Sequence, residues 1–295
     1  METHEELRPY LFAIAYRMLG SVAEAEDVVQ EAYLRYHASG VEADSPKSFL
    51  AAVTTRLAID ELRSARVRRE VYPGEWLPEP LVDDESIMHA ETADSLSLTF
   101  LHLLEKLSPV ERAVFLLREV FDYSYDEISG IVGKSPDNCR QILVRARRHV
   151  EEGRRRFDVS LEERDEVARR FVAAWEDGDV EELIELLAPD ATVYGDGGGK
   201  APAIREPLVG AERVAKALVG WARLGREQIP GLSHRLATVN GDPGLVFEDG
   251  EGRTLWVAAL EIADGVVLAV RSILNPDKLA HLNPAAPDPA PTNRS

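Results

Sequence analysis

The chain is poor in cysteine and has no long apolar run. Cys139 is the one cysteine among 295 residues, which excludes an intramolecular disulfide and a cysteine-rich zinc site. The first residues are acidic, and no apolar stretch approaches the ~20 residues that a membrane-spanning helix needs. Metal-ligand spacings, phosphate loops and nucleophile elbows are also missing. These absences predict a cytoplasmic protein with no signal peptide, membrane segment, metal or cofactor.

Basic charge is scarce overall. Lys and Arg number 34 against 52 Asp and Glu, which gives a formal net charge of −18 and argues against a general phosphate binder. The acid is unevenly placed, however. Residues 71–100 hold seven acidic and no basic side chains, whereas residues 134–157 hold eight basic and three acidic ones. The locally basic segment is therefore still suited to DNA.

That basic segment belongs to a predicted helix-turn-helix at residues 108–149. Ser124 stands three residues before Glu127, the spacing of a capping box, and Ser135 precedes Pro136, a cap followed by a first helical residue. Polar side chains lie away from the apolar side of the second helix: Asn138, Arg140, Gln141, Arg145, Arg147 and Arg148. Reading base edges in a major groove requires such groups near a helix N-terminus.

The remaining chain divides into blocks by composition. Residues 1–70 have the apolar spacing of helices, with starts predicted at the Ser21–Glu24 capping pair and at Ser45-Pro46. Residues 71–95 form an acidic linker, which contains Trp76-Leu77-Pro78-Glu79-Pro80. A solvated linker rarely contains Trp and Leu beside two prolines, so we expect this segment to dock on another part of the molecule. Residues 96–157 form a second helical block.

The C-terminal part has a different pattern. Residues 160–282 begin with helices and continue with β-branched segments, punctuated by the hairpin signals Asn240-Gly241 and Asp264-Gly265. This order predicts an α+β domain with a curved antiparallel sheet. Residues 283–295 are rich in Pro and Ala, which predicts a disordered tail. The fold class is thus multidomain, with two all-α blocks followed by an α+β domain.

Several short sequence motifs, called words below, resemble those of a known family. Residues 25–32 and 48–63 resemble region 2 of an extracytoplasmic-function (ECF) sigma factor, and residues 125–128 and 144–147 resemble its region 4. Residues 163–282 resemble a SnoaL-like domain, which implies an α+β cone of curved sheet closed by helices. Three further words resemble the signature of the sigma factors that carry this domain at the C-terminus: Trp76-Leu77-Pro78-Glu79-Pro80, Asp196-Gly197-Gly198-Gly199-Lys200 and Asn275-Pro276-Asp277-Lys278-Leu279.

The resemblance implies partners and site residues. Core RNA polymerase would bind region 2 through Asp27, Gln30 and Glu31, for which ordinary solvated helix residues are the alternative. In the proximal promoter element (−10), the resemblance places Arg56, Asp60 and Arg63 nearest the bases, and Arg66, Arg68 and Arg69 on phosphate. The distal element (−35) would meet these residues: Ser135, Asn138, Arg140, Gln141, Arg145, Arg147 and Arg148. Some of these arginines could instead form intrahelical pairs.

Three hypotheses stay open for the C-terminal domain and for the chain as a whole. In the first, it regulates the sigma modules in cis and no separate anti-sigma factor is required. The interdomain residues would then be Trp76, Leu77, Pro78, Asp196, Gly197, Gly198, Gly199, Lys200, Asn275, Pro276, Asp277, Lys278 and Leu279; for the glycines, a plain turn is the alternative. In the second, the domain binds or converts a small molecule at four candidate lining residues: Tyr194, His234, Glu248 and Trp256. A stand-alone helix-turn-helix regulator is the third hypothesis, and catalysis is not expected.

Overall fold

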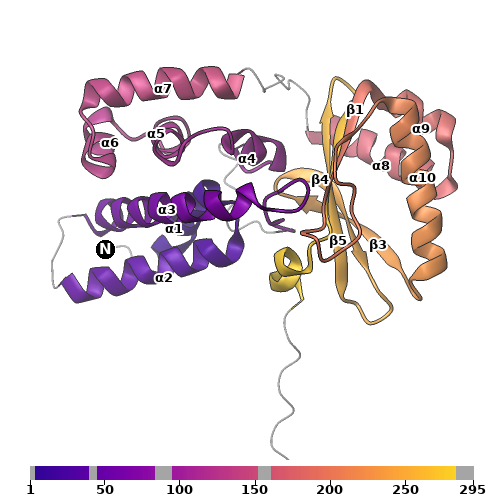
Figure 1. Ribbon diagram of the computed structural model, residues 1–295, viewed down its shortest axis with the longest axis horizontal. Coiled ribbons are helices and arrows are strands. Elements are labelled where there is room, and N and C mark those ends of the chain that lie inside the picture. Colours follow the sequence, from indigo (N-terminus) through magenta and orange to yellow (C-terminus); the bar gives the residue numbers. More distant parts are fainter. Residues whose placement is uncertain (1–3, 40–44, 84–94, 152–160, 284–295) are drawn as a thin grey trace, which may run out of the picture.

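The computed structural model describes residues 4–39, 45–83, 95–151 and 161–283. Helices make up the N-terminal half, and a curved sheet with its own helices makes up the C-terminal half (Figure 1). The predicted tail lies outside the described residues from position 284 onward. The predicted boundary between the second helical block and the C-terminal domain, near residue 158, also falls outside them.

The first helical module contains three helices, α1 (His4–Leu19), α2 (Val22–Ser39) and α3 (Pro46–Glu70). Ser45 caps α3 as predicted, since its side chain accepts a hydrogen bond from the Ser48 N–H. Ser21 also accepts from the Glu24 N–H at 3.2 Å. The carboxylate at this helix start, however, comes from the linker residue Glu79, which accepts from the Ser21 hydroxyl and the Val22 N–H at 2.8 and 2.6 Å.

The second helical module contains the predicted helix-turn-helix. Its helices are α4 (Leu98–Leu104), α5 (Pro109–Glu119), α6 (Tyr125–Val132) and α7 (Pro136–Glu151). The capping box predicted at Ser124 and Glu127 is confirmed, and Ser108 with Glu111 forms another at the start of α5. Gly133 ends α6 in the left-handed conformation, with φ of 66°.

The two helical modules share one hydrophobic core. It joins residues of α1, α2 and α3, such as Leu11 and Leu62, to residues of α5, α6 and α7, such as Phe115 and Leu143. Helices α1 and α3 both contact α5, and α3 also contacts α6. The modules, which the sequence places on either side of a linker, therefore pack directly against each other.

The C-terminal domain is a six-stranded sheet in the order β2-β1-β6-β5-β4-β3. Its strands are β1 (Leu187–Asp196), β2 (Leu208–Val209), β3 (Ser233–Val239), β4 (Asp242–Glu248), β5 (Thr254–Ala263) and β6 (Val266–Ile273). The predicted turns at Asn240-Gly241 and Asp264-Gly265 join β3 to β4 and β5 to β6. The sheet is mixed rather than wholly antiparallel, because β1 pairs with β6 in parallel. Hairpin signals could not predict that pairing, since α10 and four strands lie between β1 and β6 in the sequence.

Both faces of this sheet are covered. One face packs on the helices α8 (Leu161–Asp177), α9 (Val180–Leu186) and α10 (Ala211–Gln228), which lie on its side away from the helical modules (Figure 1). The other face, with Val246 and Val257, packs on Leu77 of the linker, Leu98 of α4 and Leu279 of the 3-10 helix η2 (Pro276–Leu282). That second layer is an interdomain core, so the linker docks as predicted.

The capping box of α5 provides a test of local stability. Replacing Ser108 with Ala removes the oxygen that accepts from the Glu111 N–H, which should lower the free energy of unfolding by about 1 kcal/mol. Ser108→Thr keeps a capping hydroxyl and should stay close to wild type. Urea unfolding followed by circular dichroism would measure both; an Ala variant as stable as the Thr variant would contradict the capping role.

Candidate promoter-binding surfaces and interdomain junction

The outward face of α7 presents the polar residues that the sequence assigns to the distal element. Asn138, Arg140 and Gln141 are exposed, on the opposite side from the buried Cys139 and Ile142. The Ser135 hydroxyl caps the helix by accepting from the Asn138 N–H. Val144, which sequence reasoning passed over, is 68% exposed in the middle of this face. The face is open to a ligand, and its role in reading bases stays a prediction.

Several arginines of α7 lie close to acidic side chains of α7 or of α5. Arg140 pairs with Asp137 at 2.6 Å, as the intrahelical alternative foresaw, and Arg147 pairs with Glu119 of α5 at 2.7 Å. Arg145 lies 4.0 Å from Glu111. Arg148 is exposed near the end of the helix. The exposed ion pairs among these are individually weak, so they leave the side chains able to exchange partners.

The basic residues of α3 are placed differently, because most of them bond within the protein. Arg56 donates to the carbonyls of Gly130 and Ile131 at the end of α6, at 2.6 and 3.0 Å, and Arg66 donates to the Leu107 carbonyl at 3.3 Å. Arg68 pairs with Glu24 and Glu61. Asp60 and Arg63 form an exposed pair with each other at 2.6 Å. In this arrangement, Arg56 and Arg66 of the surface predicted to meet the proximal element bond to the second module, whereas Asp60 and Arg63 stay exposed.

Arg69 lies at the meeting point of three parts of the chain. Its guanidinium donates to Glu105 of α4 at 2.5 Å and to the Leu19 carbonyl of α1 at 2.6 Å, and its carbon centre lies 3.5 Å from the Trp76 ring centroid. Only 12% of its side chain is exposed. Arg69 thus joins the first module, the second module and the linker, and its predicted phosphate contact would need another arrangement.

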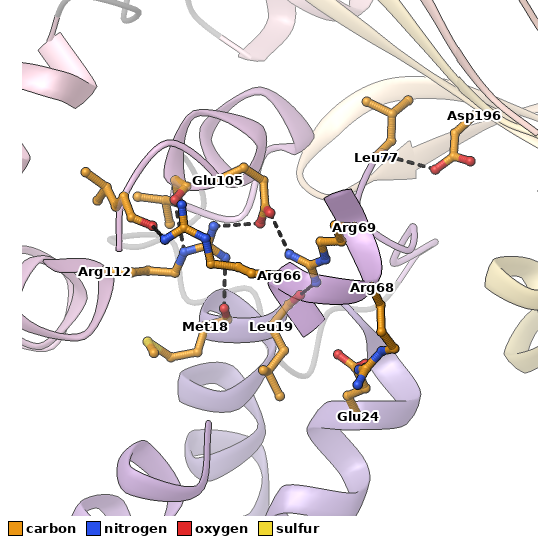
Figure 2. A network of polar contacts seen from close by, with 12 residues as sticks. Met18, Leu19, Glu24, Arg66, Arg68, Arg69, Leu77, Glu105, Arg112 and Asp196 are labelled. Atoms are coloured by element: carbon orange, nitrogen blue, oxygen red, sulfur yellow. Dashed lines mark hydrogen bonds and ion pairs between the residues drawn. The ribbon is translucent and has the colours of Figure 1, made fainter. Parts of the chain in front are cut away.

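A second buried arginine completes this network (Figure 2). Arg112 of α5 is 2% exposed and donates to Glu105, to the Leu104 carbonyl and, at 2.8 Å, to the Met18 carbonyl of α1. Burial alone would raise the pKa of Glu105, but Arg112 and Arg69 outweigh it and hold that pKa below its ordinary value. Glu105 therefore stays ionised between two cations, and the end of α1 receives an arginine from each module.

The three signature words meet at one junction. Asp196 is 0% exposed and accepts from the Leu77 N–H at 2.8 Å, the Tyr72 hydroxyl at 2.5 Å and the Lys278 ammonium at 2.6 Å. Lys278 also donates to the Leu77 carbonyl, and its ammonium lies 4.0 Å from the Trp76 ring centroid. Burial lowers the pKa of Lys278 to about 8, although Asp196 favours its charged form.

The other residues of the three signature words surround Asp196 and Lys278. Gly198 has φ of 57°, and a Cβ there would come within 2.3 Å of the Asn275 amide. Asn275 in turn donates to the Tyr72 hydroxyl at 2.8 Å. The remaining members are Pro78 and Leu279, both buried, the turn residues Gly197 and Gly199, Pro276 at the start of η2, and the exposed pair of Lys200 with Asp277. The predicted contact among the words is confirmed; its regulatory role stays a prediction.

Several junction residues escaped sequence reasoning. Tyr72, Glu105, Arg112 and Asn240 all bond across modules, yet each partner lies far away in sequence or belongs to an unremarkable helix. His102 of α4 lies between Glu75 of the linker, 3.4 Å away, and the Tyr194 ring. Only Tyr72 offered a signal, since it is an aromatic residue next to the docked linker word.

The polar residues proposed to line a cavity do not converge. Tyr194 packs with the interdomain core, near His102 and Arg271, whereas Trp256 stacks on Phe247 under the helices of the opposite face. His234 bonds to Glu176 at 2.7 Å. Glu248 lies 4.0 Å from Arg235 at the sheet margin. The four groups therefore do not form one site.

The described ranges of the chain hold no group of three or more His, Cys, Asp or Glu side chains placed to bind a metal ion. None of the helices there is both long enough and apolar enough to cross a membrane.

Comparison with known proteins places these modules in a family. Residues 3–68 match Sigma-70 region 2, residues 97–150 match Sigma-70 region 4, and residues 168–272 match the SnoaL-like domain. The chain is 36% identical over 287 residues to the ECF RNA polymerase sigma factor SigJ of Mycobacterium tuberculosis, covering 93% of this chain and 91% of the relative. It is 32% identical to the probable ECF RNA polymerase sigma factor SigI of that species, with 92% of each covered.

A solved structure agrees with the sequence comparisons. The crystal structure of M. tuberculosis SigJ has a TM-score of 0.76 to this chain at 32% identity, over 93% of this chain and 96% of that one. Fold and matches together define a two-module sigma architecture followed by a SnoaL-like domain. The chain belongs to the ECF RNA polymerase sigma factors. Its function is that of a sigma factor, which directs core RNA polymerase to promoters to initiate transcription.

Within region 2, the predicted polymerase-binding residues lie on the outer side of α2. Asp27 and Gln30 are exposed, and Glu31, which pairs with Arg35 at 2.7 Å, is half-buried. Leu34 is 58% exposed one turn further along and adds an apolar group to this face. The binding role of these residues stays a prediction.

The buried pair of Lys278 and Asp196 has an exposed counterpart between the same two words. Replacing Lys278 with Met leaves the Asp196 carboxylate without its countercharge, and breaking a buried pair in this way costs about 3–5 kcal/mol. Lys200→Met breaks the exposed pair with Asp277, which is worth about 0–1 kcal/mol. Urea unfolding of the two variants should separate them clearly. Equal losses would show that burial does not decide the energetics of this junction.

His102 should make the junction sensitive to acid. Burial, followed by the nearby Arg271, lowers the pKa of His102 to about 4. Between its ordinary value of about 6.5 and that value, the unfolded chain takes up a proton that the folded chain does not, so stability falls as the pH falls. The stability lost from pH 7 to pH 5 should be about 2 kcal/mol smaller in His102→Phe than in wild type. Parallel acid losses in urea titrations would refute the assignment.

Proposed function

We propose that the SnoaL-like domain restrains this sigma factor in cis by holding its two promoter-reading modules together. The observation that carries the proposal is the environment of Trp76. Its indole contacts Arg69, which bonds to both modules, and Lys278, which belongs to the C-terminal domain. Through these contacts, the Trp76 side chain connects the linker with both helical modules and with the C-terminal domain.

Distances along DNA support the restraint. The proximal and distal elements are roughly 25 base pairs apart by their conventional positions, or about 85 Å at 3.4 Å per base pair. Here α3 and α7 both pack on α5, which places them roughly two interhelix spacings, ~20 Å, apart. The two helices cannot reach both elements at once in this arrangement, so the modules must separate before a promoter is read.

Core polymerase and promoter DNA are the partners of an open form, in which the two modules are separated. In the closed form, the arrangement described here, the C-terminal domain takes the place of a separate anti-sigma factor. Since polymerase and the chromosome are in the cytoplasm, the protein would act there. We infer that the domain is not an enzyme, because its four candidate polar residues are divided between two faces of the sheet. A small-molecule ligand would act by shifting the closed and open forms.

Run-off transcription with core polymerase tests this function. Lys278→Met should raise transcript yield several-fold over wild type, because it weakens the junction that holds the closed form, while Lys200→Met should match wild type. Unchanged or lower yield from the Lys278 variant would contradict restraint in cis. Transcription should also require core polymerase, and tight promoter binding by the protein alone would favour a stand-alone helix-turn-helix regulator.

A further inference from the structure

The turn between β3 and β4 is buried in the helical half of the molecule. Asn240, its first central residue, has φ of 53° and is only 2% exposed. Asp264 occupies the same position in the turn between β5 and β6, with φ of 51°, and is exposed. Both turns need residues that tolerate positive φ. The turn at Asn240 lies against other modules, whereas the turn at Asp264 does not need such contacts to form. Turn formation therefore does not explain the surroundings of Asn240.

Asn240 bonds to three separate segments. Its side-chain oxygen accepts from the Leu81 N–H of the linker at 2.9 Å, and its own N–H donates to the Leu81 carbonyl at 2.8 Å. Its amide nitrogen donates to the Tyr16 hydroxyl of α1 at 2.8 Å and to the Leu96 carbonyl, just before α4, at 3.0 Å. The side chain thus reaches region 2, the linker and the start of region 4.

These partners define the side chain that the position requires. The Leu81 N–H needs an acceptor, while the Leu96 carbonyl needs a donor, and an amide supplies both. Asp would place a second acceptor beside the Leu96 carbonyl. Gly would keep the turn but supply neither group. Asn is therefore the residue that fits the backbone conformation and all three partners together.

The linker is held alternately by the two halves of the molecule. Leu77 bonds through its N–H to Asp196, and Leu81 bonds to Asn240, so both are held by the C-terminal domain. Glu79, between them, bonds region 2: its N–H donates to the Gly20 carbonyl, and its carbonyl accepts from Tyr16 at 2.5 Å. The contacts at Leu81 therefore form a second attachment point, four residues beyond the first.

We propose that Asn240 is a positioning residue that fixes the linker against α1 and the start of region 4, as a second clasp separate from Asp196 and Lys278. Its effect on transcription rests on the proposed restraint in cis. Loss of the amide should loosen the linker between Glu79 and Asp83, because it removes the side-chain bonds of Asn240 to Leu81 and to Tyr16, while Leu77 stays bound. The β3–β4 turn thus has its own role in holding the modules and the linker together, separate from that of the three signature words.

Hydrogen exchange of full-length protein tests the positioning role directly. Asn240→Gly keeps the turn and removes the amide, and Asp264→Gly is the matched control at the exposed turn. The diagnostic amides are those of Glu79 and Asp83, which bond to Gly20 and Thr238 rather than to the Asn240 side chain. In Asn240→Gly they should exchange about tenfold faster than in wild type, as expected for losing hydrogen bonds that close a local structure. Amides of β5 and β6 should not change.

A double variant checks the partner. Tyr16→Phe removes the hydroxyl that accepts from Asn240 and that also donates to the Glu79 carbonyl, so the two substitutions are compared at Asp83. There, combining Tyr16→Phe with Asn240→Gly should add little to the exchange rate of the single Gly variant. Exchange at Glu79 and Asp83 in Asn240→Gly that matches the Asp264→Gly control would overturn the positioning role, as would fully additive effects of the two substitutions at Asp83.

Run-off transcription separates this proposal from the one it rests on. Faster linker exchange with raised transcript yield in Asn240→Gly supports both. Faster exchange with wild-type yield supports the positioning role and contradicts restraint in cis. Wild-type exchange in Asn240→Gly, together with raised yield in Lys278→Met, overturns the role of Asn240 and leaves the restraint standing.

Discussion

A carboxylate that is wholly withdrawn from water must be compensated by charge and hydrogen bonds, and Asp196 is the point where this constraint shapes the molecule. Its compensation comes from outside its own strand: an ammonium from η2, a backbone N–H from the linker and a hydroxyl from the residues after α3. Because these donors belong to different parts of the chain, satisfying one buried charge brings the linker, η2 and β1 together. The linker in turn draws both helical modules toward the sheet.

The sheet of the C-terminal domain contributes one face to each of two hydrophobic cores. The face under α8, α9 and α10 is filled by stacked aromatic side chains, including Phe247 and Trp256 at 4.2 Å between ring centroids. The other face is not left to solvent but forms the interdomain core with Leu77 and Leu98. The sheet thus serves as the surface on which the linker and α4 pack.

Structural features could be predicted from the sequence when the residues that cause them lie close together in the chain. The Ser124–Glu127 box and both hairpin turns are set by residues within a few positions of one another, and the structure has them as expected. Arg56 was assigned to DNA from its helix and family, but its donation to Gly130 and Ile131 depends on packing 75 residues away. Asn240 was read as a turn residue because nothing nearby indicates its partners. The signature words predicted which segments meet, though not the buried charge that joins them.

The C-terminal end of α1 has a consequence for how the closed form responds to DNA. Its carbonyls, at the negative end of the helix dipole, hold Arg69 and Arg112, and Glu105 bridges the two cations. Arg69 is also a predicted phosphate ligand, so under the proposed restraint nucleic acid and the closed form would compete for the same guanidinium. Promoter binding and opening would then be thermodynamically linked, with the promoter as a ligand that has different affinities for the two forms. Promoter DNA would in this way help to release Arg69 from its contacts in the closed form.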